Sequence, residues 1–490
     1  MANSQSSDDL ALLSVAEMTR ADQAAVAAGV AGTTLMENAG AAIARQIVNR
    51  WTQRPVAVLC GPGNNGGDGF VVARLLKEAG WPVRLALLGE RKRLTGDAGY
   101  MAERWSGPTE PPSPAILEGA GLIVDALFGA GLARSLEGAA RLLIEAADEA
   151  DAPIVAVDLP SGVHGDSGGV LGIAAQAALT VTFFRRKPGH LLLPGRLRSG
   201  EIITADIGIP ETVLAEIAPK QHENGPGPWL EHFPRPRLSD HKYSRGHVVI
   251  ASGEAMTGAA RLAARGAMRI GAGMVSIASP PSAVAIYAGA MPGVLVRPVA
   301  RPVDFVALLD DRRVSAILVG PGNGASDRTR AHALAALGTR RPVVLDADAL
   351  NVFEGDGSAL ASSIRGPCVL TPHEGEFSRL FGHLQGSKLE RARAAAELTG
   401  AVVVLKGGDS VIAGPDGAAC IATNAPPTLA TAGAGDVLAG MIVGLMGQGM
   451  PPFAAASAAV WLHGEAANAF GPGLIAEDLP EQLPGVLREL

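Results

Sequence analysis

The sequence predicts an α/β protein with two domains, each built on a mainly parallel sheet covered by helices. Short apolar runs rich in Val, Ile and Leu alternate with longer segments of helical composition along the 490 residues. The runs are continuously apolar, as strands buried on both faces of a parallel sheet are. The alternation of strand and helix indicates crossover connections, which keep neighbouring strands parallel.

The predicted strands fall into two groups. In the first half of the chain they are Val56–Cys60, Val83–Leu88, Leu122–Leu127, Ile154–Val157 and Thr180–Phe184. In the second half they are His247–Ser252, Met274–Ala278, Ala316–Val319, Val343–Leu345, Val369–Thr371 and Val402–Leu405. Phe70–Ala79 and Gly258–Arg269 are predicted helices, and Leu10–Arg50 is predicted to form one or two Ala-rich helices before the first strand.

A proline-rich segment separates the two groups of strands. Six prolines and no long apolar run lie between Pro210 and Arg237. We therefore expect the domain boundary near Gln221, with a first domain of residues 1–221 and a second of residues 222–490. Each half has the size of one α/β domain.

Composition excludes several classes of protein. Hydrophobic residues make up 48% of the chain and charged residues 18%, which suits packed cores and excludes disorder. A net charge of −7 without a long Lys/Arg cluster argues against nucleic-acid or anionic-membrane partners. Prolines interrupt both long uncharged stretches, Ile270–Val296 and Val437–Leu462, so neither is a predicted membrane span.

The cysteines and the N-terminal residues indicate the cellular compartment of the protein. The three cysteines contain no CxxC pair, which suits a reducing environment. The first residues are polar and acidic, unlike a secretory signal. We expect a cytoplasmic protein, and we also expect a homo-oligomer.

A loop rich in glycine and asparagine follows the first predicted strand. Residues 61–69 read GPGNNGGDG, and the glycines at 61, 63 and 66 fit a dinucleotide-binding fingerprint. Such residues permit positive φ and expose backbone N–H groups that bind phosphate. The alternative is a Gly-rich turn with Asp68 capping the next helix. Because the loop is richer in glycine and asparagine than a turn requires, we predict a binding site.

Acidic residues end two further strands of the first half. Asp125 follows one apolar run, and Asp158 follows another with Ser161 three residues later. Either carboxylate alone is explained by capping a helix or holding a turn. Both should meet the glycine-rich loop at the carboxyl edge of the sheet, where ligands of such sheets bind. Amide, carboxylate and hydroxyl oxygens gathered there suit a hard cation.

These segments carry a family resemblance. The motifs are LMENAG at 35–40, GNNGGDG at 63–69, DALFGAGL at 125–132, VDLPSG at 157–162 and FRRKPG at 184–189. Across residues 10–215 the chain resembles the NAD(P)H-hydrate epimerases. The resemblance implies a Rossmann-like domain that interconverts the R and S epimers of hydrated NADH and NADPH (NADHX and NADPHX) and binds a potassium ion (K⁺).

The same resemblance implies roles for particular residues. The dinucleotide contacts would be Asn64, Asn65, Gly66, Gly67, Asp68, Gly129, Ala130, Gly131, Leu132, Ala133, Arg134, Ser135 and Asp158. The K⁺ ligands would be Asn65, Asp125 and Ser161. We expect Asp158 to manage the proton in epimerisation, with Lys187 as the second candidate.

In the second half, small residues precede a long apolar helix. Gly433-Ala434-Gly435 and then Asp436 lead into the segment that begins at Val437. Such a loop can aim N–H groups and the positive end of the helix at an anion. Asp436 would then orient a hydroxyl group towards a phosphoryl group. The alternative is that Asp436 only caps the helix.

Other loops of the second half favour a binding site at Asp436 over a helix cap. Lys406 and two glycines follow one predicted strand, and His373 stands between acids after another. Asp346 and Asp348 end a further strand, where they would bind magnesium or cap the following turn. The loops at 320–324 and 256–259 supply small residues where a bulky ligand could approach.

Together these loops resemble the ribokinase-like superfamily, and specifically the ADP-dependent NAD(P)H-hydrate dehydratases, over about residues 235–488. The resemblance implies hydrate contacts by Ala259, Gly322, His373 and Asp436. It implies an adenine-nucleotide site formed by Lys406, Gly407, Gly408, Asp409, Ser410 and Gly435. ADP and Mg²⁺ are the expected co-substrate and cofactor, with Asp158 and Asp436 as the catalytic residues of the two domains.

The two resemblances together predict a repair enzyme in which the first domain supplies the epimer that the second dehydrates. Phosphorylation of the hydroxyl group would turn it into a good leaving group, and the products would be NAD(P)H, AMP and phosphate. Two alternatives remain open at this stage. One is a ribokinase-like kinase of a small alcohol, and the other has a non-catalytic dinucleotide-binding module as one of the domains.

Overall fold

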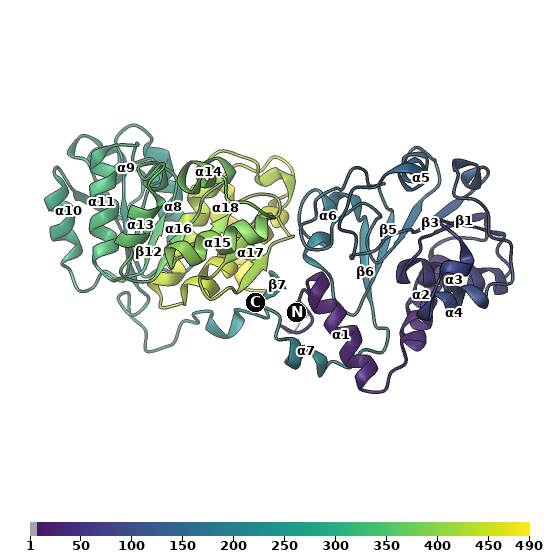
Figure 1. Cartoon of the computed structure of the whole chain (residues 1–490). Coiled ribbons are helices and arrows are strands. Elements are labelled where there is room, and N and C mark those ends of the chain that lie inside the picture. Colours follow the sequence, from purple (N-terminus) through teal and green to yellow (C-terminus); the bar gives the residue numbers. More distant parts are fainter. Residues whose placement is uncertain (1–6) are drawn as a thin grey trace. The chain divides into compact units, whose positions relative to one another are not determined.

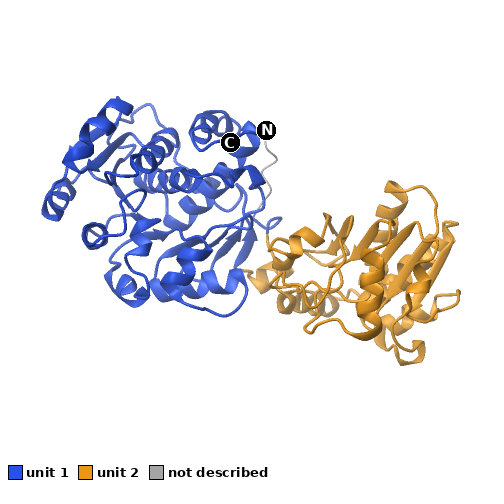
Figure 2. Cartoon of the chain, turned by 90° about the horizontal axis from the view of Figure 1, so that it is seen from above, with its two compact units in different colours: residues 1–10, 220–490 blue, residues 11–219 orange. Residues whose placement is uncertain are grey.

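The computed structural model describes residues 7–490 (Figure 1). The chain forms two compact units, coloured separately in Figure 2. The N-terminal unit is Ala11–Pro219. The C-terminal unit is Lys220–Leu490 together with the described residues up to Leu10.

The N-terminal unit is built on a six-stranded sheet in the order β2-β1-β3-β4-β5-β6. All neighbouring strands are parallel. The strands are β1 (Val56–Cys60), β2 (Val83–Leu87), β3 (Leu122–Ala126), β4 (Ile154–Val157), β5 (Leu179–Phe183) and β6 (Glu201–Ala205). The helices are α1 (Val15–Ala27), α2 (Gly32–Arg50), α3 (Asn64–Glu78), α4 (Gly96–Glu103), α5 (Gly138–Asp148), α6 (Gly195–Arg198) and α7 (Val213–Ile217).

The C-terminal unit is built on a ten-stranded sheet in the order β10-β9-β8-β11-β12-β13-β14-β15-β16-β7. Only β15 is antiparallel to its neighbours. The strands are β7 (Gln221–Glu223), β8 (His247–Ala251), β9 (Met274–Ser279), β10 (Leu295–Pro298), β11 (Ala316–Val319), β12 (Val343–Leu345), β13 (Cys368–Leu370), β14 (Val402–Leu405), β15 (Val411–Ala413) and β16 (Ala419–Ile421).

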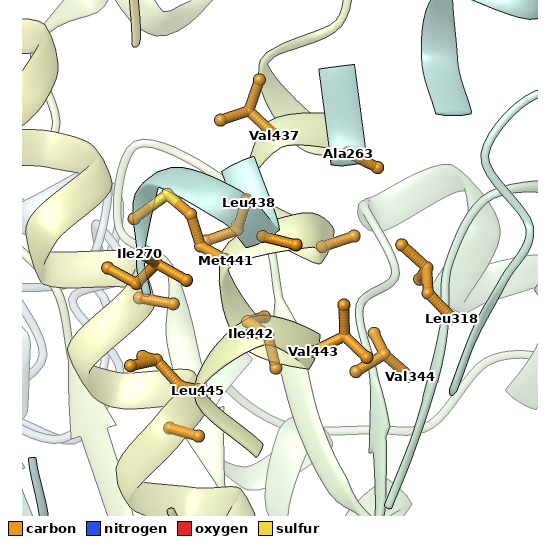
Figure 3. Close-up of a cluster of buried hydrophobic side chains, with 14 of the residues drawn as sticks. Ala263, Ile270, Leu318, Val344, Val437, Leu438, Met441, Ile442, Val443 and Leu445 are labelled. Atoms are coloured by element: carbon orange, nitrogen blue, oxygen red, sulfur yellow. The ribbon is translucent and has the colours of Figure 1, made fainter. Parts of the chain in front are cut away.

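Helices cover this second sheet. They are α8 (Thr257–Arg269), α9 (Val284–Ala290), α10 (Pro302–Leu309), α11 (Asp327–Gly338), α12 (Asp348–Asn351), α13 (Gly357–Ser363), α14 (Glu374–Phe381), α15 (Lys388–Thr399), α16 (Ala434–Gly447), α17 (Pro452–Phe470) and α18 (Asp478–Leu487). Nearly every residue of α16 is buried, because it packs on α8 and on the apolar side chains of β11 and β12 (Figure 3). This apolar core fixes the N-terminal end of α16, where Asp436 lies.

The predicted fold class is confirmed: both sheets are mainly parallel and covered by helices. The eleven predicted strands all form, with ends that differ by at most one residue. Five further strands, β6, β7, β10, β15 and β16, had no matching prediction. β6 and β10 lie at sheet edges and are partly exposed, so they lack the continuous apolar run that marks a buried strand.

The two units divide near, but not at, residue 221. β7 begins at Gln221 and pairs with β16 of the C-terminal unit, so the chain enters that unit before the predicted boundary. The Leu10 carbonyl oxygen accepts a hydrogen bond from the Glu223 N–H, which ties the chain's first described residues to β7. No helix in residues 7–490 has the length and hydropathy needed to cross a bilayer.

Candidate active sites

A cavity of about 980 Å³ lies in the N-terminal unit at the carboxyl ends of β1, β3 and β4. Parallel strands direct their following loops to this edge, and α1 and α2 complete the wall. The predicted residues that line the cavity are Asn64, Asn65, Asp68, Gly129, Ala130, Gly131, Leu132, Ala133, Arg134 and Asp158. Most of the dinucleotide contacts expected from the sequence therefore face one space.

Three of the expected contacts, Gly66, Gly67 and Ser135, are not among the residues that line this cavity. The expectation of a nine-residue loop was wrong, because α3 begins at Asn64 and takes Gly66 and Gly67 into its first turn. A Cβ on Gly66 would lie 1.9 Å from the Gly61 carbonyl oxygen. Close packing of backbone therefore accounts for this glycine.

Asp158 is the most constrained acid of the cavity. Its backbone has φ 65°, in the left-handed region. Its Oδ1 accepts hydrogen bonds from Lys187 Nζ at 2.7 Å and Thr182 Oγ1 at 2.9 Å. Its Oδ2 accepts one from the Ala130 N–H at 3.0 Å. Although burial opposes ionisation, Lys187 and His190 together with these hydrogen bonds lower the pKa of Asp158 to about 2.

Two other cavity acids, Asp22 of α1 and Asp68 of α3, differ from Asp158. No hydrogen bond or ion pair within residues 7–490 involves either carboxyl group. Burial raises the pKa of Asp22 to about 6, and Asp158 also raises it while Lys187 opposes the shift. Burial also raises the pKa of Asp68 well above its ordinary value. Asp158 is thus held ionised, whereas Asp22 and Asp68 of the same cavity protonate more readily.

Of the three predicted K⁺ ligands, Asn65 lines this cavity, and Asp125 and Ser161 contact each other. Asp125 at the end of β3 accepts hydrogen bonds from the Ser161 hydroxyl at 2.6 Å and the Ser161 N–H at 2.8 Å. With the Asn65 amide turned so that its nitrogen and oxygen both meet suitable partners, the side chain donates to the Val157 carbonyl oxygen at 3.1 Å and accepts from the Gly129 N–H at 3.3 Å.

A cation fits this oxygen set, since Asp125 is 1% exposed and pairs with no basic side chain of the described chain. Oxygen donors of these types suit an alkali or alkaline-earth ion. Within residues 7–490 no group of three or more His, Cys, Asp or Glu side chains is placed to hold a metal. The donor set therefore favours a hard cation over zinc.

In the C-terminal unit, a partly buried lysine pairs with a buried acid at a strand end. Lys406 follows β14, and its Nζ lies 2.9 Å from Asp346 Oδ1 and 3.9 Å from Glu376 Oε2. The Thr371 hydroxyl also donates to Asp346 Oδ1, at 2.7 Å. A Cβ on Gly435 would lie 3.5 Å from Lys406 Nζ, so the lysine approaches the first turn of α16.

Asp436 is the third residue of α16, and the helix is preceded by Gly433 with φ 90°. The N-cap position therefore belongs to Gly433, and the alternative in which Asp436 is the cap residue is wrong. Burial raises the pKa of Asp436 to about 7, and the neighbouring Asp346 adds to the shift while Lys406 opposes it. Asp436 can therefore gain or lose a proton near neutral pH.

The predicted nucleotide loop, residues 406–410, is held by its own side chains. The Ser410 hydroxyl accepts from the Gly407 N–H at 3.0 Å and donates to the Gly407 carbonyl oxygen at 2.8 Å. Asp409 forms an ion pair with Lys388 of α15 at 2.6 Å. These contacts fix the turn that presents the Lys406 side chain and the loop's backbone.

The remaining predicted contacts lie at other strand ends of the same unit. His373 caps α14, where its Nδ1 accepts from the N–H groups of Gly375 at 3.0 Å and Glu376 at 3.3 Å. A Cβ on Gly322 would lie 3.2 Å from the Ala259 Cβ, so the loop after β11 packs directly on α8. His373 and Lys406 form a β-bridge, which joins two of the predicted loops.

Several site residues were missed at the sequence level. Thr182 and His190 both contact Asp158, and Lys388 holds Asp409, yet none stands in a distinctive motif. Asp22 lies on an Ala-rich helix and reaches the cavity only through tertiary packing. In the sequence, the available signal for this site residue was a single polar residue, Asp22, on an otherwise apolar face of the helix.

Two α/β units, each with buried acid–lysine pairs at the carboxyl edge of a parallel sheet, define a two-domain protein with a candidate site in each domain. Family models match both. Residues 32–189 match the YjeF-related protein N-terminus family, and residues 247–483 match the NAD(P)H-hydrate dehydratase family.

Relatives match along almost the whole chain. The bifunctional NAD(P)H-hydrate repair enzyme of Salinibacter ruber is 38% identical, over 94% of this chain and 93% of its own. That of Coxiella burnetii is 36% identical, over 94% of this chain and 95% of its own. The chain belongs to the family of bifunctional NAD(P)H-hydrate repair enzymes.

Among solved structures, the ADP/ATP-dependent NAD(P)H-hydrate dehydratase of Bacillus subtilis, co-crystallised with ATP and Mg²⁺, is 31% identical with a TM-score of 0.47. The match covers 52% of this chain and 94% of that one.

Proposed function

We propose that the chain repairs hydrated NADH and NADPH, with an epimerase site in the N-terminal unit and a nucleotide-dependent dehydratase site in the C-terminal unit. The observation that carries the proposal is the cavity of about 980 Å³ lined by the residues expected to bind a dinucleotide. Its volume is at the upper end of the range for small-molecule sites, which suits a dinucleotide. The names of the full-length relatives support both activities.

In the N-terminal unit, the N-terminal end of α3 and the residues 129–134 would bind the dinucleotide, because both line the cavity and no side chain in the described part of the chain caps the start of α3. The constrained Asp158 would hold the reacting ring in place. Its three donors leave it ionised, so its contacts favour a fixed negative charge over the expected role of proton carrier. Lys187, buried against Asp158, would stabilise that charge.

The K⁺ ion would be held by Asn65, Asp125 and Ser161. The neighbouring Phe128 carbonyl oxygen would be a further ligand. That oxygen lies 3.1 Å from the Ser161 hydroxyl oxygen. The ion would supply positive charge next to the loop that carries Gly129. We expect K⁺ to raise the thermal unfolding midpoint of the wild type and to leave that of Asp125→Asn unchanged.

In the C-terminal unit, Asp436 would orient the hydroxyl group of the S hydrate and take its proton as a phosphoryl group is transferred from ADP. The hydroxyl oxygen forms the new bond to phosphorus, and AMP leaves. The ring nitrogen's lone pair then expels phosphate, and loss of a ring proton yields NAD(P)H. The backbone N–H groups at the start of α16 would stabilise the phosphoryl oxygens.

Lys406 and the turn it begins would bind the nucleotide, with Mg²⁺ neutralising its phosphates. Mg²⁺ commonly takes only one or two protein carboxylates when a nucleotide supplies the other ligands. Asp346 fits this role in part, since Lys406 and Thr371 occupy its Oδ1. Ala259, Gly322 and His373 would contact the hydrate. The three cysteines are buried and free, which supports a reducing, cytoplasmic setting.

The test is incubation of mixed R and S hydrates with the full chain, ADP and Mg²⁺. We expect both epimers to disappear while NAD(P)H absorbance, phosphate and AMP rise together. A parallel reaction with ATP measures the nucleotide preference. A stable phosphorylated product without NAD(P)H would instead identify a kinase and contradict the proposal.

A further inference from the structure

Epimerisation through loss and return of water is helped by a group that can both give a proton to the hydroxyl oxygen on the ring carbon and take one from the water that adds there. Asp158 is poorly suited, because Lys187 Nζ, Thr182 Oγ1 and the Ala130 N–H already occupy its two oxygens. Lys187 is also committed, with its Nζ donating to both Asp158 and Thr182. The proton must therefore be handled by another side chain of the cavity.

Asp22 has the geometry that Asp158 lacks. It projects from the middle of α1 into the wall of the cavity that contains Asn64, Gly129 and Asp158. Its carboxyl group is partly buried and makes no hydrogen bond or ion pair with any other described residue. Both of its oxygens are therefore available to a bound ligand.

We propose that Asp22 is a catalytic residue of epimerisation, acting as the acid and then the base that exchanges a proton with the hydroxyl group of the hydrate. This role rests on the proposed function of the N-terminal unit. It assigns the chemistry to α1, which lies outside every motif that suggested the site.

The steps balance without an external reagent. The protonated Asp22 gives its proton to the hydroxyl oxygen, and the ring nitrogen's lone pair forms a C=N bond as water leaves. A water molecule then adds to the opposite face of the ring carbon. It returns one proton to the Asp22 carboxylate, and the C=N electrons return to nitrogen. The product is the other epimer, and Asp22 is protonated again.

The charges around Asp22 favour a carboxyl group that is protonated in part near neutral pH. The other ionisable side chains of the same cavity wall are Asp68, Asp97, Arg134, Asp158 and Lys187. Helix α7 also packs on α1, and its acidic residue Glu216 is exposed and outside the cavity wall. Burial and Asp158 raise the pKa of Asp22 to about 6 against the effect of Lys187. Since the acid form begins the reaction, the epimerisation rate should fall as pH rises through about 6.

The experiment follows the R and S hydrates with the full chain in the absence of nucleotide, so that dehydration does not remove them. Asp22→Asn is expected to lower kcat for epimerisation at least 100-fold, within the range for general acid–base catalysis, and to change KM much less. The remaining activity should lose its pH dependence near 6. Asp22→Glu, which keeps the carboxyl group, should restore part of the activity and the pH dependence. The matched control is Asp151→Asn, which removes an exposed charge from the same unit.

The rate of epimerisation in buffer alone is subtracted from every measurement. The outcomes then separate the catalytic role of Asp22 from the proposed epimerase function of the N-terminal unit. If the wild type epimerises and Asp22→Asn keeps kcat within about threefold, the role of Asp22 is overturned and the proposed function stands. A wild-type rate that does not fall above pH 6 also overturns it. If the wild type does not epimerise, the proposed function of the unit fails, and this role fails with it. Thermal unfolding of each variant shows whether it is folded, and Asp22→Ser, which also removes the carboxyl group, replaces Asp22→Asn if that variant is not.

Discussion

Each candidate site contains a lysine that forms an ion pair with an aspartate at a strand end. The side chain of Lys187 is 2% exposed and pairs with Asp158, which is 14% exposed. The side chain of Lys406 is 19% exposed and pairs with Asp346, which is 2% exposed. Because desolvation of both charges offsets their attraction, such pairs add little net stability. The presence of an ion pair at both sites is better explained by the fixed charges that the pair provides for ligand binding.

Lys187→Met tests this view of the N-terminal pair. The change leaves the Asp158 carboxylate buried without its cation, so we expect a loss of about 3–5 kcal/mol in the free energy of unfolding. Urea unfolding at neutral pH measures it. The double variant Lys187→Met/Asp158→Asn removes the unpaired charge and should regain part of the loss. A double variant no more stable than Lys187→Met would contradict the explanation.

The pKa of Asp436 predicts the pH dependence of dehydration. Burial raises this pKa to about 7, and the group must be ionised to accept the hydroxyl proton. The dehydration rate should therefore rise as pH rises through about 7. Asp436→Asn should lower the rate by on the order of 10²–10³ or more and remove this rise. Phosphate release from the S hydrate with ADP and Mg²⁺ measures both, and a pH-independent wild type would contradict the assignment.

At the level of elements, the strands with continuous apolar runs were predictable, whereas the partly exposed edge strands β6 and β10 and the three-residue strands β7, β15 and β16 were not. β1 and β11 are fully buried, and their apolar runs appear directly in the sequence. β6 reads EIITA and is only partly buried, so its pattern does not differ from that of a loop. β15 and β16 are three-residue strands that exist through pairing with neighbours. Pairing of this kind leaves no local pattern in a single sequence.

The start of α3 shows why part of the site was not predictable. Glycine has a low helix propensity, so NNGGDG is expected to be a loop. Tertiary packing overrides that preference, because the glycines allow α3 to approach its neighbours closely. A Cβ on Gly69 would lie 2.8 Å from Cys60 Sγ, and one on Gly67 2.6 Å from Met36 Sδ. The strand-end acids Asp125 and Asp158 were predictable from the strand pattern, and Asp436 from the small residues that precede an apolar helix.

Gly433→Ala tests the loop at the start of α16. Gly433 has φ 90°, and a Cβ there would lie 2.6 Å from Leu262 Cδ1. A non-glycine residue in the left-handed region costs roughly 1–2 kcal/mol, which should lower the dehydration rate about tenfold if it displaces the Asp436 turn. Gly289→Ala on α9 is the matched control, because that position is exposed, with no atom within 4 Å of a Cβ. Equal effects of the two changes on kcat would contradict the prediction.

On the scale of the whole molecule, the N-terminal unit is inserted in the sequence of the C-terminal unit. The chain pairs with β7 at Leu10, builds Ala11–Pro219, and returns at Lys220 (Figure 2). The residues that line the cavity all belong to the N-terminal unit, and Lys406, Asp346 and Asp436 all belong to the other. Each site is therefore built within one unit.

Two sites of this kind should complement one another between separate molecules. With mixed hydrates, ADP and Mg²⁺, Asp158→Asn should consume the S hydrate and leave the R hydrate, because only epimerisation is lost. Asp436→Asn should interconvert the epimers and release no phosphate. An equimolar mixture of the two variants should consume both epimers, since the hydrate can pass through solution from one site to the other. Chromatography of R and S hydrates over time measures this against a buffer control. If the mixture left the R hydrate, the two activities would need to lie on one chain, and independent sites would be ruled out.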